Sequence, residues 1–210
     1  MGGVVITALL IIIVTVAVVI VCAAAFLMYR RLAASRTRTV SSSAPADPFA
    51  DTDSDAIRGN PRTLTAGDLV DIFGVTYTVR GRLRLSEGGY DWSEHLLDTG
   101  DDEQAWLSVE EDPDLELVLW KPAADAPEPG GPELRYDQQV FRRQESGTAR
   151  YRSEATTGLS AHGTVTYHDY STADDTRLSF EDYGGTGRYE AALGQVLNRS
   201  ALMIYPRQQP

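Results

Sequence analysis

Residues 75–86 read VTYTVRGRLRLS, and their alternation is the clearest structural signal in the chain. Apart from Gly81, apolar side chains occupy every second position: Val75, Tyr77, Val79, Leu83 and Leu85. The intervening positions hold threonine, arginine or serine. A period of two in β-branched and aromatic residues is typical of strands with one buried face. The stretch therefore predicts half-buried β-structure.

The same pattern recurs along the chain in short runs separated by glycine, aspartate and proline. The further predicted strands are 90–98, 104–110, 115–121, 134–144, 148–156, 164–171, 176–182, 187–193 and 200–205. Turn residues separate runs at 87–89, 99–102, 145–147 and 184–187, and a Pro/Gly-rich loop covers 122–133. About ten short strands predict an all-β fold, a sandwich or a barrel. Residues 189–197 are also compatible with a short helix.

A weak internal repeat supports a symmetric arrangement. The segment 106–112 (WLSVEED) resembles 177–183 (RLSFEDY). Each copy follows an acidic turn and an aromatic-rich strand, and the loop 122–133 falls between the copies. We therefore expect two repeated β-meanders packed about a pseudo-two-fold axis.

The N-terminal region carries a separate signal. Residues 4–28 contain no charge, proline or glycine, and as a helix they would span roughly 37 Å, enough to cross a bilayer. A cleaved signal peptide is the alternative. The arginines that follow predict a cytoplasmic side after the helix and an external N-terminus: Arg30, Arg31, Arg36 and Arg38. The predicted location is therefore the cell membrane, with a single span.

These signals divide the chain into five parts. Residues 1–3 are an external N-terminus, and 4–28 are the transmembrane helix. Residues 29–63 form a basic juxtamembrane segment and a linker, predicted to be disordered because it is rich in serine, proline and aspartate. Residues 64–206 form a cytoplasmic β-domain, and 207–210 are a tail.

Composition limits the partners. The single cysteine, Cys22, lies in the predicted span, so the β-domain has no disulfide and no cysteine-based nucleophile or metal site. From residue 61 onward there are 26 acidic and 14 basic residues, a net charge of −12. Nucleic acid is therefore not an expected partner, because phosphate binding needs a positive surface. The acidity suits an unknown protein or a small cationic ligand, although it can also serve solubility alone. The oligomeric state is left open.

Four residues are the candidate binding set. Glu110 and Glu181 hold matching places in the repeat, and symmetric packing would bring them together as a cation site or an acid/base pair. The alternative is two solvent-facing glutamates. Trp92 and Glu94 share one face of the strand 90–98. They could belong to the core, form a recognition surface or act in catalysis.

No established catalytic or cofactor motif is present. His162 and His168-Asp169 lack the spacing of a metal site, since two histidine ligands commonly lie one helical turn apart. There is no Gly-x-Ser-x-Gly nucleophile motif, and the glycines at 184–187 lack the Lys-Ser/Thr of a phosphate loop. We therefore predict no catalytic residue, no metal and no cofactor.

The spacing of several residues resembles a known family. The pattern is Tyr77-x-Val79-x-Gly81, Trp92-x-Glu94-x-x-Leu97, Trp106-Leu107, Tyr167-x-Asp169-Tyr170, Leu178-Ser179-x-Glu181 and Gly194. Over residues 64–206 the chain resembles the bacterial domain-of-unknown-function family 4178, in its membrane-anchored actinobacterial type. The family has no established activity. The resemblance implies an N-terminal spanning helix and gene neighbours that include polyamine-synthase-like proteins.

Two main hypotheses follow. The first is a non-enzymatic module that binds a protein or a small cationic ligand. The alternative is an enzyme or accessory subunit that uses Glu94, Glu110 or Glu181 as a carboxylate site, linked to polyamine metabolism. Convergence of these carboxyls in one pocket, with raised pKa values, would favour a carboxylate site. A weaker third hypothesis is oligomerisation through strand edges.

Overall fold

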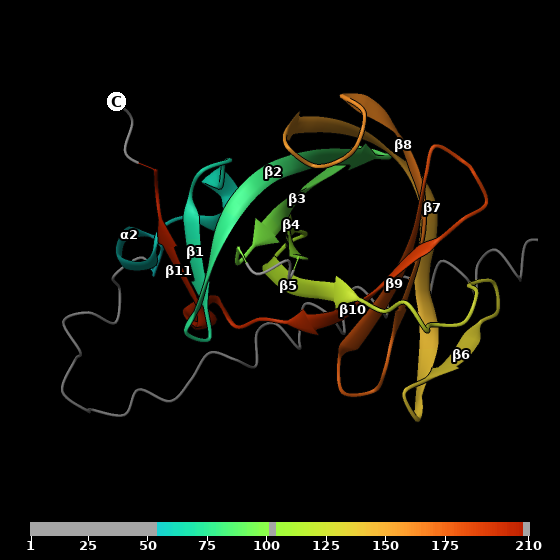
Figure 1. The fold of residues 1–210 in the computed structure, drawn as a ribbon. Coiled ribbons are helices and arrows are strands. Elements are labelled where there is room, and N and C mark those ends of the chain that lie inside the picture. Colours follow the sequence, from blue (N-terminus) through green and yellow to red (C-terminus); the bar gives the residue numbers. More distant parts are fainter. Residues whose placement is uncertain (1–53, 101–103, 208–210) are drawn as a thin grey trace, which may run out of the picture. The chain divides into compact units, whose positions relative to one another are not determined.

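The computed structural model describes residues 54–100 and 104–207, and it confirms the all-β prediction (Figure 1). The described residues contain eleven strands in one antiparallel sheet. The strands are β1 (Leu69–Ile72), β2 (Val75–Glu87), β3 (Tyr90–Asp98), β4 (Gln104–Glu111), β5 (Leu115–Pro122), β6 (Glu133–Tyr136), β7 (Gln139–Ala155), β8 (His162–Ser171), β9 (Thr176–Tyr183), β10 (Glu190–Val196) and β11 (Leu202–Tyr205). The helical elements are α2 (Ser54–Arg58) and the 3-10 turns η1 (Pro61–Thr63) and η2 (Arg199–Ala201).

The sheet closes into a barrel. Its order is β11-β1-β2-β3-β4-β5-β10-β9-β8-β7-β6, and an additional pairing joins β2 to β7. In this closing pair, Gly81–Ser86 lie opposite Arg150–Ala155. Eight strands, from β2 around to β7, therefore form a closed ring (Figure 1). A barrel replaces the sandwich alternative, because every strand of the ring is hydrogen-bonded on both sides.

The structure corrects one part of the fold prediction, the transmembrane helix. Within 54–100 and 104–207, no helix is long and apolar enough to cross a membrane. The longest, α2, has five residues and rises only about 7.5 Å. The predicted span, residues 4–28, and the four arginines that set its orientation lie outside the described residues.

The described residues include 54–63, ahead of the predicted domain boundary at 64. Both α2 and η1 lie within the segment 29–63 that was predicted to be a disordered linker. Arg62 explains part of this order, since its guanidinium contacts Glu111 on β4 at 2.7 Å and Asp55 on α2 at 3.0 Å. Asp55 also contacts Arg199 at 2.9 Å. The low hydrophobicity of residues 29–63 predicted disorder, and it gave no indication of these charged contacts.

The ring consists of two four-stranded meanders, β2–β5 and β7–β10. They meet at the β5–β10 and β2–β7 pairings, so the order of the strands around the ring has a pseudo-two-fold symmetry that relates one meander to the other. The two segments of the predicted repeat fall on β4 and β9, which hold equivalent places in the meanders. Two local predictions were wrong: the turn at 145–147 lies inside the long strand β7, and the predicted strand 134–144 is divided between β6 and β7. At 189–197 the predicted strand is present as β10, and the helix alternative is not.

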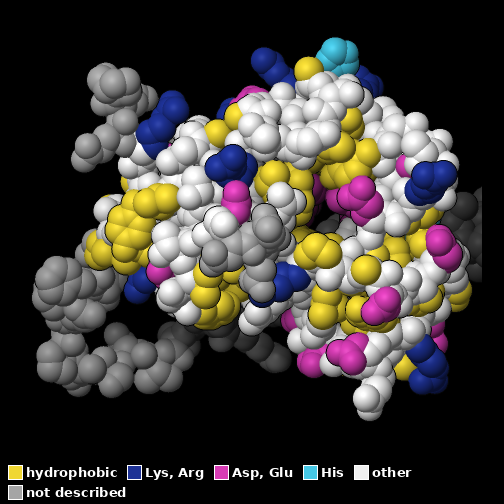
Figure 2. All heavy atoms as spheres, viewed as in Figure 1, with side chains coloured by type: hydrophobic (Ala, Val, Ile, Leu, Met, Phe, Trp, Pro, Cys, Tyr) yellow, Lys and Arg dark blue, Asp and Glu magenta, His cyan; other side chains and the backbone are white. Residues whose placement is uncertain are grey.

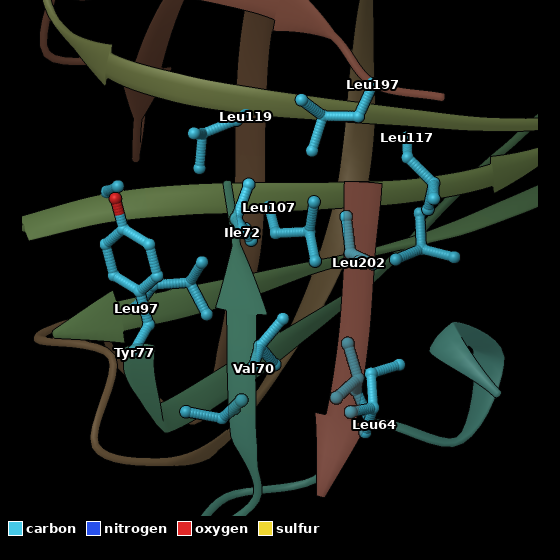
Figure 3. Close-up of a cluster of buried hydrophobic side chains, with 14 residues drawn as sticks. Leu64, Val70, Ile72, Tyr77, Leu97, Leu107, Leu117, Leu119, Leu197 and Leu202 are labelled. Atoms are coloured by element: carbon cyan, nitrogen blue, oxygen red, sulfur yellow. The ribbon is translucent and has the colours of Figure 1, made fainter. Parts of the chain in front are cut away.

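A large apolar core lies outside the ring. Val70 and Ile72 on β1 and Leu202 on β11 pack against the outer face of β3–β5 (Figure 3). The leucines on that face include Leu97 and Leu107. Fully burying such a side chain contributes about 1.5–3 kcal/mol. Because neighbouring side chains of a strand alternate between faces, the residues between these leucines point into the barrel.

Candidate functional site

The inside of the barrel contains a cavity beside a cluster of packed apolar side chains. A cavity of about 1040 Å³ lies among the inward-facing side chains of the ring and extends to the loop after β5. Figure 2 shows acidic side chains around an opening on the face that is in view. Among the described residues that line the cavity are ten carboxyl side chains and one basic side chain, Arg177. The cavity is therefore strongly acidic.

Aromatic residues form much of its wall. All three tryptophans of the chain line it: Trp92, Trp106 and Trp120. Trp92 meets Tyr167 edge to face, with ring centroids 6.3 Å apart. Trp120 lies directly over Gly194, where a Cβ atom would come within 2.5 Å of the indole ring. Gly194 thus provides the space that lets the Trp120 indole lie close against the backbone of β10.

Three carboxyls at the inner part of the cavity have raised pKa values. Burial is the main cause in each case. It raises the pKa of Glu94 to about 7 and that of Asp169 to about 6. The pKa of Glu181 lies well above its usual range, first through burial and then through the charge of Glu94. None of the three forms an ion pair with a described residue.

Hydrogen bonds hold these carboxyls in place. The Trp92 indole donates to Glu94 Oε1 over 3.3 Å, and the Tyr183 hydroxyl donates to Glu181 Oε2 over 3.0 Å. Both bonds lower the pKa of the carboxyl that accepts them, against the effect of burial. Burial and the nearby carboxylates raise the pKa of Tyr183, so its hydroxyl keeps its proton and stays a donor.

The carboxyl positions follow the pseudo-symmetry of the meanders. Glu94 lies opposite Ser108 in the β3–β4 pair, and Asp169 lies opposite Ser179 in the equivalent β8–β9 pair. In the neighbouring β4–β5 pair Glu110 lies opposite Glu116, and in the equivalent β9–β10 pair Glu181 lies opposite Glu190. Each half of the barrel thus contributes a similar set of acids, which the closed ring places around one interior.

Arg177 lies among these acids, on the same strand as Glu181. Its Nη2 contacts Glu116 Oε2 at 3.1 Å. Burial and neighbouring acids, Glu116 first, raise the pKa of Glu110, while the charge of Arg177 opposes that shift. Arg177 corresponds to Trp106 in the repeat, so at this position the two halves of the barrel differ: one has a charged side chain and the other an aromatic one.

All four residues of the predicted binding set line this cavity: Trp92, Glu94, Glu110 and Glu181. Glu110 is the most exposed of the carboxyls among them. Their role in binding stays a prediction. Sequence reasoning missed Asp169 and Arg177 as members of the site. The equivalence of Asp169 to Glu94 is visible only in the strand pairing, where Asp169 lies opposite Ser179 as Glu94 lies opposite Ser108.

The histidines lie elsewhere. His162 is exposed, and the His168 ring contacts Tyr189 rather than a carboxyl, with Nε2 3.3 Å from the hydroxyl. Residues 54–100 and 104–207 contain no group of three His, Cys, Asp or Glu side chains arranged to hold a metal ion.

Fold and cavity together define an eight-stranded antiparallel barrel with an acidic, aromatic-lined interior of ligand size. The chain belongs to the family described as domain of unknown function DUF4178, which matches residues 65–199. Nothing in these comparisons shows the membrane-anchored actinobacterial type, which stays a prediction.

The chain also has curated relatives. It is 39% identical over 153 residues to uncharacterised proteins of Mycobacterium tuberculosis (strain ATCC 25618 / H37Rv) and Mycobacterium bovis (strain ATCC BAA-935 / AF2122/97). The similarity covers 70% of this chain and 73% of each relative. No solved structure was found to match the chain.

Proposed function

We propose that this domain is a non-enzymatic binding module that takes up a small organic cation inside its barrel. The observation that carries the proposal is the convergence of Glu94, Asp169 and Glu181 in one aromatic-walled cavity with no ion pair among the described residues. An isolated buried carboxylate is costly, so such groups tend to keep their protons. A bound cation would supply the missing opposite charge and let them ionise.

The walls favour an organic cation over an inorganic one. A cationic ammonium group over the face of a tryptophan or tyrosine gains about 0.5–2 kcal/mol beyond its contact with carboxylates. Trp92, Trp106 and Tyr167 lie on the same inner surface as the carboxyls. The volume, about 1040 Å³, is slightly above the range of roughly 300–1,000 Å³ that is usual for small-molecule sites.

Calorimetry on the full chain tests the proposal. The probes are n-butylammonium, tetramethylammonium and 1,4-diaminobutane, with butyrate as the anion of matched size. We expect the cations to bind and to raise the melting temperature, and butyrate to do neither. A ligand at 100 times its Kd adds about 2.7 kcal/mol to the free energy of unfolding.

Variants locate the binding. The double variant Glu94→Gln/Glu181→Gln should lose at least tenfold in cation affinity. Glu133→Gln is the matched control, because Glu133 is an exposed carboxyl on β6 that does not line the cavity. Cations that bind no better than butyrate, or that bind the double variant as tightly as the unaltered chain, would overturn the proposal.

An enzyme or accessory subunit with a carboxylate site, linked to polyamine metabolism, is the second candidate. The observation that favours it is the raised pKa of Glu94, about 7, since a general acid or base works best with a pKa near the working pH. Incubating the chain with 1,4-diaminobutane and following the amine by proton NMR separates the candidates. New carbon-bound signals that Glu94→Gln abolishes would indicate turnover, and an unchanged spectrum with binding would indicate a binding module.

A further inference from the structure

The outer face of the pairing that closes the barrel carries a row of basic side chains. Arg84 of β2 lies directly opposite Arg152 of β7, and Arg152 lies opposite His162 of β8. All three side chains are exposed, and none of them lines the cavity. Figure 2 shows basic side chains beside a histidine at the top of the view. This row contrasts with the net charge of −12 that the chain carries from residue 61 onward.

A second row of hydrogen-bond donors lies beside the first. Two residues along β7, Arg150 lies opposite Ser86 of β2 and Thr164 of β8, and all three are exposed. Cβ atoms of directly opposite residues are about 5 Å apart, and residues two apart along a strand are separated by about 7 Å. The two rows therefore cover an area of roughly 10 by 7 Å. We call these residues the basic face: Arg84, Ser86, Arg150, Arg152, His162 and Thr164.

The positive charge of the basic face is only partly balanced. Glu154 contacts Arg84 at 3.0 Å, but it also pairs with a second arginine, Arg82. Neither Arg150 nor Arg152 forms an ion pair with a described residue. Like charges that lie directly opposite each other on neighbouring strands are destabilising. An external anion would therefore relieve repulsion that the fold itself leaves in place.

The donors indicate which anion fits. Arginine forks bind phosphate oxygens in pairs, and serine and threonine hydroxyls donate to the same kind of acceptor. The basic face lies on the outside of the sheet and lines no cavity, so it offers no enclosure for a free ion. A surface that presents many phosphates can engage several arginines at once, which multiplies weak single contacts. The headgroups of an anionic bilayer form such a surface.

The acidity of the rest of the domain opposes this contact only weakly. At physiological ionic strength, interactions between exposed charges are screened beyond about 8 Å. Carboxyls such as Glu94 and Glu181 line the cavity and not the basic face. Asp91 lies opposite Ser86 and is the carboxyl that borders the face on β3. Close to a charged surface, the local excess of arginine therefore sets the sign of the interaction.

We propose that the basic face rests on the phosphate headgroups of an anionic lipid bilayer. The inference does not depend on cation uptake, because the basic face and the cavity share no residue. Each arginine close to an anionic surface adds about fivefold to the affinity, so the three arginines of the face together add about a hundredfold.

Chemical footprinting of the full chain tests this at each arginine. Phenylglyoxal modifies accessible arginines, and mass spectrometry of the peptides gives the rate at each one. The chain is mixed with vesicles of phosphatidylcholine alone, or with phosphatidylglycerol added in a ratio of about two to one. Modification of Arg150 and Arg152 should slow at least fivefold in the anionic vesicles only. Exposed arginines elsewhere, Arg135 on β6 and Arg207 after β11, should react equally in both. Binding through another part of the chain does not affect this comparison.

Two double variants assign the protection to the basic face. In Arg150→Gln/Arg152→Gln two charges are lost, so the remaining Arg84 should react at the same rate with both kinds of vesicle. Arg135→Gln/Arg207→Gln is the matched control, because it removes the same charge from exposed positions outside the face. In the control, Arg84 should keep its protection. Circular dichroism of both variants checks that they are folded.

Several outcomes would overturn the proposal. Equal rates at Arg150 in neutral and anionic vesicles would do so, as would equal protection of Arg135. Protection of Arg84 that survives in Arg150→Gln/Arg152→Gln would also count against it. Inorganic phosphate and poly(U) are tested without vesicles at the same phosphate concentration. If either protects the face as well as the anionic vesicles do, the partner is a free phosphate or a nucleic acid, and the bilayer assignment fails.

Discussion

Glu94 of β3 and Glu181 of β9 interact electrostatically inside the barrel, and the charge of Glu94 raises the pKa of Glu181 beyond the effect of burial. The two residues come from different meanders and meet only because the ring is closed. Since each ionisation opposes the other, the pair takes up and releases protons as a unit.

The first prediction concerns stability and pH. The folded-state pKa values of Glu94 and Asp169, about 7 and about 6, exceed the ordinary values of 4.5 and 3.8. Between these limits the folded chain holds more protons than the unfolded chain, so the free energy of unfolding should fall as pH rises from 5 to 7.5. Urea unfolding at several pH values should show a loss on the order of 2 kcal/mol.

The direction should reverse in stronger acid. The Arg82 guanidinium lowers the pKa of Glu154, so the stabilisation from that pair is lost as pH falls below the ordinary carboxyl range. Stability should therefore peak near pH 5. A free energy of unfolding that rises steadily from pH 5 to pH 8 would contradict the raised pKa values.

The second prediction is that neutralising an inner carboxyl stabilises the empty barrel at alkaline pH. Glu94→Gln keeps the shape and the acceptor oxygen for Trp92 but removes a buried charge. At pH 8 the free energy of unfolding should increase by about 1–2 kcal/mol, and at pH 5 it should change by less than about 0.5 kcal/mol. Glu133→Gln should have little effect at either pH, and a destabilised Glu94→Gln chain at pH 8 would count against the assignment.

The third prediction is that cation binding releases protons. An amine favours the ionised forms of Glu94, Asp169 and Glu181, so its affinity should increase between pH 6 and pH 8. Titrations in buffers with different ionisation enthalpies should give about one proton released per cation at pH 6.5. Heats that do not depend on the buffer would show that the carboxyls are already ionised.

The fourth prediction concerns the packing of Trp120. In Gly194→Ala the new methyl group would meet the indole ring at 2.5 Å and the Val118 side chain at 2.8 Å. Overpacking of this kind typically costs about 1–3 kcal/mol, so thermal melting should show a clearly lower midpoint and an altered tryptophan fluorescence. In the control Gly131→Ala the nearest atom is 3.2 Å away, and the midpoint should shift less.

Much of this architecture could be predicted from the residues along the chain. Side chains alternate between faces of a strand, so the spacing of Tyr77, Val79, Leu83 and Leu85 already indicated strands with one buried face. The same rule placed Trp92 with Glu94 on one face of β3, and the repeat related Glu110 to Glu181. The family could also be recognised from these spacings.

Other features depended on contacts between distant segments. Period-two alternation fits a sandwich and a barrel equally well, and the pairing of Gly81–Ser86 with Arg150–Ala155 is what makes the ring. The order at 54–63 depends on ion pairs with residues far along the chain, which local hydrophobicity does not report. The predicted helix 4–28 lies outside the described residues.

Local sequence thus indicated most of the strands and which side chains share a face, because side-chain alternation depends on near neighbours. The meeting of Glu94, Asp169 and Glu181 and the raised pKa values that follow came from ring closure. Burial and electrostatic coupling depend on distances through space, and only the folded barrel sets those distances.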